Sequence, residues 1–140
     1  MSRADFYTLK DNHGDARYRL LQQLLSKSLG QGTAVHIHCR DAAEVGHLDN
    51  YIWAFKPESF LPHHALSDGD ENDMSSPITL GHGLQRPEQA GICVNLSAEP
   101  VQGYERIIEI VVQEPTILEQ TRAHYRHYQQ AGHEMNLHKL

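Results

Sequence analysis

Apolar positions along the first third of the chain alternate between the spacing of strands and the spacing of helices. The pattern predicts strands over residues 5–9 and 34–39, each followed by a helix. The first helix, over 13–29, ends at glycines, and the second begins at the capping residue Asp41 with Glu44 three positions on. Strand–helix–strand–helix order is typical of an α/β sheet. The faces expected to be buried are Leu20, Leu21, Leu24, Leu25 and Leu29, and then Val45, Leu48 and Ile52.

The rest of the chain continues this plan after an interruption. Residues 56–77 contain an extended, proline-rich loop and then a polar, acidic stretch. After Pro115 a final helix is predicted over 116–131, and it ends at Gly132. Strands are predicted over 77–80, 91–96 and 107–112, the last of them buried and rich in β-branched residues, although a helix also fits that run.

These elements predict one domain over residues 1–140. We expect a mostly parallel, Rossmann-like sheet in three layers, with helices on both faces. The chain has 12 Lys and Arg against 18 Asp and Glu, a net charge of −6, which argues against general nucleic-acid binding. No signal peptide and no membrane-spanning run is recognised, so a cytoplasmic protein is expected. Cys39 and Cys93 lie in apolar runs and are expected to be buried free thiols.

Eleven histidines raise the question of a metal site. His36 and His38 share one face of a predicted strand. His133 and His138 frame a stretch that resembles a zinc-protease motif, but their spacing is one residue too long for a single helical face. We therefore expect no metal, while a histidine-dependent metal-binding or pH-responsive protein remains an alternative.

The glycines do not complete a nucleotide-binding motif. Gly30 and Gly32 follow a helix, and Gly81 and Gly83 follow a strand without a third glycine or a Lys-Ser/Thr pair. No phosphate-binding loop and no cofactor are expected, and neither a nucleophile elbow nor a paired-carboxylate arrangement is present. A small nucleotide- or metal-dependent α/β enzyme stays open as the second hypothesis.

The final helix presents the most informative face. At helical spacing Arg122, Tyr125, Arg126 and Gln129 lie together. The last twenty residues have a net charge of +2, whereas the remainder of the chain has −8. Two guanidinium groups beside an aromatic ring favour a small, acidic and partly apolar ligand. The alternative is an ordinary solvated helix surface.

A second candidate surface follows the second helix. Trp53 ends that helix and Phe60 begins the proline-rich loop. Aromatic side chains at such a junction either close the core or anchor a protein partner.

Several segments together resemble the chi subunit of bacterial DNA polymerase III. The resemblance extends over essentially the whole chain. It is found in Asp5-Phe6-Tyr7, in Leu48-Asp49 with Trp53, in Glu58-Ser59-Phe60-Leu61-Pro62-His63, and in the tail from Arg122 through Tyr125-Arg126 to Gly132.

The resemblance implies a non-catalytic accessory subunit of the clamp-loader complex. Members pair with the psi subunit and bind the acidic, phenylalanine-terminated tail of single-stranded DNA-binding protein. A helicase competes for the psi surface in some members. A further basic residue of the family's tail pocket has no match at 116–120. The residues implied for the tail are Arg122, Tyr125 and Arg126, with Gln129 extending the face, and those for psi are Trp53, Phe60, Pro62 and His63.

Overall fold

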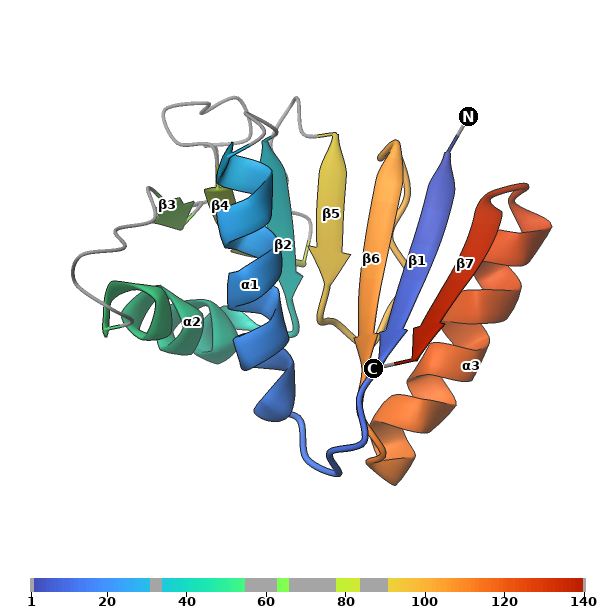
Figure 1. Ribbon diagram of the computed structural model, residues 1–140, viewed down its shortest axis with the longest axis horizontal. Helices are drawn as coiled ribbons and strands as arrows, with labels where there is room; N and C mark the ends of the chain where they lie inside the picture. Colours follow the sequence, from blue (N-terminus) through green and yellow to red (C-terminus); the bar gives the residue numbers. More distant parts are fainter. Residues whose placement is uncertain (1, 31–33, 55–62, 66–77, 84–90, 140) are drawn as a thin grey trace.

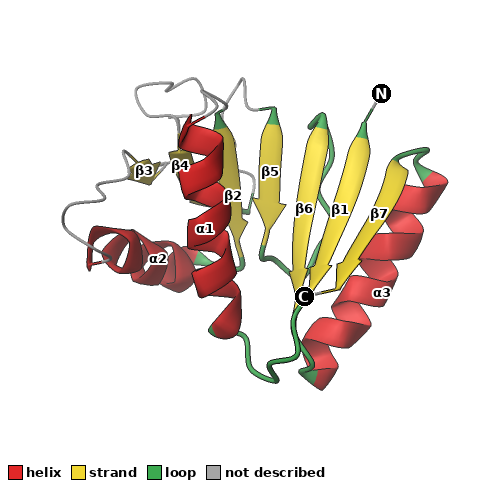
Figure 2. Ribbon diagram, in the orientation of Figure 1, coloured by secondary structure: helices red, strands yellow, loops and turns green. Residues whose placement is uncertain are grey.

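The computed structural model describes residues 2–30, 34–54, 63–65, 78–83 and 91–139. These residues form three helices and seven strands (Figures 1 and 2). In chain order the elements are β1 (Arg3–Thr8), α1 (Ala16–Gly30), β2 (Val35–Cys39), α2 (Ala42–Ala54), β3 (His63–Ala65), β4 (Ile78–His82), β5 (Ile92–Asn95), β6 (Arg106–Val111), α3 (Pro115–Gln130) and β7 (Glu134–Lys139).

The strands form one sheet in the order β3-β4-β2-β5-β6-β1-β7, and every neighbouring pair is parallel. Helices α1 and α2 pack on one face and α3 on the other, as the two core clusters show. The predicted three-layer α/β fold is therefore confirmed. No helix among the described residues is long and apolar enough to cross a membrane.

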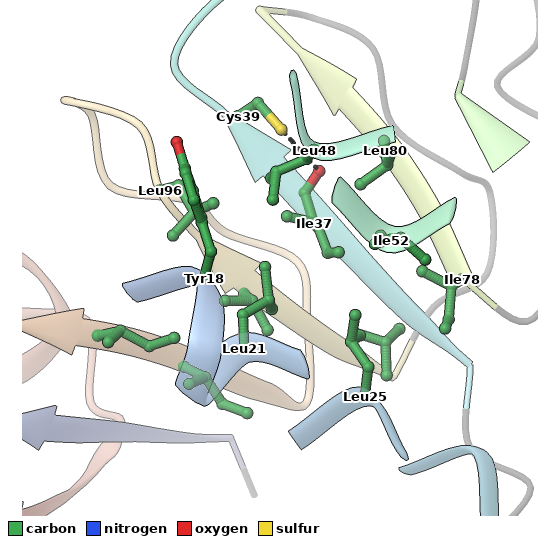
Figure 3. Close-up of a cluster of buried hydrophobic side chains, with 14 of the residues drawn as sticks. Tyr18, Leu21, Leu25, Ile37, Cys39, Leu48, Ile52, Ile78, Leu80 and Leu96 are labelled. Atoms are coloured by element: carbon green, nitrogen blue, oxygen red, sulfur yellow. Dashed lines mark hydrogen bonds between the residues drawn. The ribbon is translucent and has the colours of Figure 1, made fainter. Parts of the chain in front are cut away.

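The first core fills the space between the sheet and the two N-terminal helices (Figure 3). Alternate positions of β2 point toward these helices, so Ile37 and Cys39 are fully buried there. Helix α1 contributes Leu21 and Leu25, and α2 contributes the predicted Val45, Leu48 and Ile52. Leu20 and Leu24 are only partly buried at the edge of this cluster.

The second core lies between α3 and the sheet, over strands β5, β6, β1 and β7. Phe6 on β1 and Tyr128 on α3 are its largest fully buried members, and their ring centroids are 6.1 Å apart. The cluster also contains the other predicted thiol, Cys93, and like Cys39 it is buried and not in a disulfide. Residues Ala4, Tyr104, Ile107 and Val111 complete the cluster.

Three predictions about element positions are wrong. Strand β6 is buried as expected, but it is not the last strand, because β7 follows α3 and pairs with β1. The loop predicted through His63 and His64 contains the short strand β3. Helix α1 begins at Ala16 instead of residue 13, because residues before it form a turn in which Arg17 N–H donates to the Gly14 carbonyl at 3.1 Å.

The predicted capping box of α2 is half formed. The Glu44 amide donates to Asp41 Oδ1 at 2.9 Å, as expected for a capping aspartate. The Glu44 carboxylate accepts from the Arg40 amide at 2.6 Å instead of from Asp41. The hydrogen bond from the Glu44 amide helps to lower the pKa of the Asp41 carboxyl.

Candidate functional site

Helix α3 is defined at both ends by side-chain and backbone caps. Glu114 is the N-cap, and its carboxylate accepts from the amides of Thr116 at 3.1 Å and Ile117 at 2.9 Å. These backbone hydrogen bonds lower the pKa of Glu114. Gly132 follows the C-cap with φ +87°, the left-handed conformation that glycine adopts without strain. The helix therefore ends where the sequence predicts.

The predicted face of α3 is present on its outer side. Arg122, Arg126 and Gln129 are exposed, and Tyr125 is half-buried. The Tyr125 ring lies 5.5 Å, centroid to centroid, from Phe6, which fixes it against the sheet. Within the described part of the chain neither arginine forms an ion pair. We call these four residues the arginine face.

Strand β7 adds an apolar position that the sequence reasoning missed. Leu137 is 65% exposed, and the described residues contain no other large hydrophobic side chain classed as exposed. It lies in register with Phe6 and shares a strand face with Met135, which packs into the second core below α3. Apolar side chains at 135 and 137 between polar neighbours are the period-two signal of a half-buried strand, which could have revealed β7.

A buried polar network lies directly under α3. The Glu109 carboxylate on β6 is hydrogen-bonded to His124 Nδ1 at 3.0 Å and accepts from the Tyr128 hydroxyl at 2.7 Å. Asn95 Nδ2 donates to the same carboxylate at 2.8 Å. His124 Nε2 donates to the Ala98 carbonyl at 2.8 Å. This network joins α3 to β5, β6 and the loop between them.

Burial and hydrogen bonding act on the pKa values of this network. Burial alone would lower the pKa of His124, but the hydrogen bond and charge of Glu109 outweigh it, so the net shift is upward. Burial and the negative charge of Glu109 raise the pKa of Tyr128, which therefore keeps its proton.

The opposite face of the sheet holds a second polar cluster, around Asp5. Arg106 Nε donates to Asp5 Oδ2 at 2.5 Å, and Arg106 Nη2 donates to the Tyr7 hydroxyl at 2.9 Å. Arg3 and His138 approach the same carboxylate at 3.5 and 3.6 Å. Burial would raise the pKa of Asp5, but its arginine partners dominate and lower it.

The carboxyl ends of the strands form a cavity of about 410 Å³, where α/β proteins commonly hold nucleotides. A carboxylate already occupies this region. Glu44 is 3% exposed, accepts from the Tyr18 hydroxyl at 2.9 Å and lies 3.7 Å from the Arg17 guanidinium. The cavity lining includes more acidic than basic side chains, which does not suit a phosphate.

The predicted psi-docking residues fall largely outside the described structure. Trp53 is in the last turn of α2 and His63 begins β3, but their side chains lie outside the described residues, as do Phe60 and Pro62 entirely. Among the residues that the structure does describe, no three His, Cys, Asp or Glu side chains gather as a metal site.

Comparison with known proteins decides the family. The model of the family described as DNA polymerase III chi subunit, HolC, matches residues 1–136. The chain belongs to this family. It is 33% identical to DNA polymerase III subunit chi of Pseudomonas aeruginosa over 143 residues, which covers 100% of this chain and 98% of that protein. It is 24% identical to the Escherichia coli protein of the same name, over 97% of each chain.

Membership confirms the resemblance seen in the sequence. The Haemophilus influenzae DNA polymerase III subunit chi is also similar, at 23% identity over 92% of this chain and 91% of that protein. The family description and the names of all three relatives denote a subunit of DNA polymerase III.

Proposed function

We propose that this chi-family protein is a non-catalytic adaptor of the cytoplasmic replication machinery. One surface would bind the psi subunit and thereby the clamp loader, and the arginine face would bind the C-terminal tail of single-stranded DNA-binding protein. The observation that supports this most is the pair Arg122 and Arg126, exposed and without an ion pair among described residues, in a chain of net charge −6.

The chemistry of the arginine face suits an acidic peptide that ends in an aromatic residue. Such a peptide needs cations for its terminal carboxylate and acidic side chains, and an apolar wall for its ring. Arg122 and Arg126, one helical turn apart, supply planar donors that match carboxylates. Tyr125, held against Phe6, and the exposed Leu137 in register with Phe6 supply apolar surface.

Psi binding is proposed from family membership and from the sequence at Trp53, Phe60, Pro62 and His63. A helicase that competes for this surface, as the family resemblance implies, remains part of the same proposal.

A bridging assay tests the adaptor function. Immobilised psi subunit should retain single-stranded DNA-binding protein only when this chain is added. Phe60→Ala should weaken capture of the chain itself roughly thirtyfold or more, since truncating an aromatic anchor costs about 2 kcal/mol or more of binding. Arg126→Ala should leave the chain on psi but lose the third protein. Retention of all three proteins by both variants would contradict the adaptor function.

A further inference from the structure

The buried histidine beneath the arginine face has an unambiguous hydrogen-bonding demand. His124 is 2% exposed, and its two ring nitrogens face a carboxylate oxygen of Glu109 and the carbonyl oxygen of Ala98. A carbonyl only accepts hydrogen bonds, and so does an ionised carboxylate. A neutral imidazole has a single N–H, so two such acceptors require the doubly protonated ring.

The surroundings of Glu109 agree with an ionised carboxylate. Its second oxygen accepts from the Tyr128 hydroxyl at 2.7 Å and from Asn95 Nδ2 at 2.8 Å. Two donors independent of His124 therefore converge on this oxygen, which matches the acceptor role of a carboxylate. The contact between His124 and Glu109 is then a buried ion pair, with side chains 2% and 6% exposed.

This ion pair lies where it can position the arginine face. His124 is two residues from both Arg122 and Arg126 and adjacent to Tyr125. Through Glu109 it joins α3 to β6, and through Ala98 it joins α3 to the loop after β5. A helix held by one central ion pair presents its outer side chains in one orientation relative to the sheet.

We propose that His124 and Glu109 are positioning residues for tail binding, and that the affinity of the tail depends on the positive charge of His124. The inference rests on the proposed function of the arginine face. When His124 loses its proton, one ring nitrogen presents a lone pair to an acceptor, and α3 or the adjoining loop must shift to relieve that contact.

The direction of the pH effect follows from the upward shift in the pKa of His124. The stabilisation of the folded state by the protonated His124 ring is fully present below the ordinary histidine pKa. It is lost as pH rises through the higher pKa of the folded state. Glu99 on the loop also favours the charged ring. Other titratable groups packed around this network are Cys93, Tyr104, Tyr125, His127, Tyr128 and His133.

The protonation state is tested first, without any peptide. Ring-nitrogen NMR on the intact chain should show His124 protonated on both nitrogens at about pH 7, where an ordinary histidine is mostly neutral. Glu109→Gln should lower the midpoint of this titration. A neutral His124 ring at pH 7 in the folded wild type would overturn the inference.

The positioning role is tested by titrating an acidic, phenylalanine-terminated peptide from about pH 6 to 9. Wild-type affinity should fall roughly threefold or more across this range, and His127→Gln, which keeps His124, should show a similar fall. Glu109→Gln should lose this fall, because a glutamine amide donates to neutral His124 Nδ1 while Nε2–H still donates to Ala98. His127 is exposed on the same helix, so its variant reports the loss of a surface charge alone.

The two proposals fail differently. If the wild type binds the peptide and Glu109→Gln has the same pH profile, the positioning role is wrong and the arginine face stands. If the wild type does not bind the peptide at any pH, the proposed function of the arginine face is itself wrong.

Discussion

Asp5 is a buried carboxylate whose charge is balanced by arginines on its own strand and on β6. Its side chain is 3% exposed and its main partner is Arg106, on β6. The central position of Asp5 in β1 makes this pair part of the junction between β1, β6 and β7. A strand that begins Arg-Ala-Asp thus places a charge in a sheet interior, which its apolar pattern does not predict.

The lowered pKa of Asp5 predicts an acid-labile contribution to stability. Because the folded-state pKa lies below the ordinary value of 3.8, the contribution is present above pH 3.8 and is lost as pH falls through the folded value. Asp5→Asn should lower the free energy of unfolding by about 2 kcal/mol at neutral pH. The difference from wild type should shrink toward acid pH in urea titrations.

A control for this prediction is available on the surface. Asp41→Asn keeps the helix cap, since asparagine caps as well as aspartate, and should change stability by only a few tenths of a kcal/mol. If Asp5→Asn and Asp41→Asn had equal effects at neutral pH, the buried ion pair would not contribute as described.

Sequence reasoning found the arginine face but not what supports it. Arg122, Tyr125 and Arg126 follow from helical spacing alone. The pairing of His124 with Glu109 joins residues 15 positions apart on two elements, so no local pattern reveals it. His124 therefore looked like one of many scattered histidines. Arg17 is likewise held by a partner distant in sequence, since it is 8% exposed and lies beside Glu44.

At the scale of elements, strong periodicity was predictive and weak edge patterns were not. The leucines of α1 identify a helix because burial dictates their spacing, whereas the β-branched run of β6 favours a strand but also fits a helix. Strand β7 is missed although Met135 and Leu137 alternate, because two apolar positions make a short signal and the flanking histidines suggest a metal motif instead. β3 has only three residues, too few for a pattern.

Replacing Gly46 in α2 and Gly132 after α3 by alanine should have opposite effects on stability. Gly46 lies exposed inside α2, where a Cβ would meet nothing within 4 Å, so Gly46→Ala should stabilise the protein by about 0.5–1 kcal/mol. Gly132 also has open space, but its φ of +87° disfavours a side chain, so Gly132→Ala should destabilise by about 1 kcal/mol. Both are measured by chemical denaturation.

The comparison isolates backbone conformation from packing, since neither new methyl group has a neighbour. A stabilising Gly132→Ala would show that α3 does not end in the left-handed turn described for it.

At the scale of the whole molecule, charge distribution predicts weak binding to DNA. The chain has a net charge of −6, and the basic residues of its last twenty positions are only Arg122, Arg126 and Lys139. These cations can neutralise only a few phosphates, and the net negative charge of the chain repels the DNA backbone. Fluorescence anisotropy with single-stranded DNA at physiological salt should show no useful affinity for the isolated chain. Tight binding would contradict an adaptor that reaches DNA through a partner protein.

The central claim, that the arginine face binds the acidic tail, is tested most directly by one peptide titration. A labelled acidic peptide ending in phenylalanine is titrated into wild type, Arg122→Ala, Arg126→Ala and Arg19→Ala. Arg19 is exposed on α1, so its variant removes the same charge elsewhere. Since a charge-assisted contact contributes about 1.5–3 kcal/mol, each α3 variant should weaken binding roughly tenfold or more, and added salt should weaken wild-type binding. Arg19→Ala should match wild type; equal affinities for all four proteins would contradict the account.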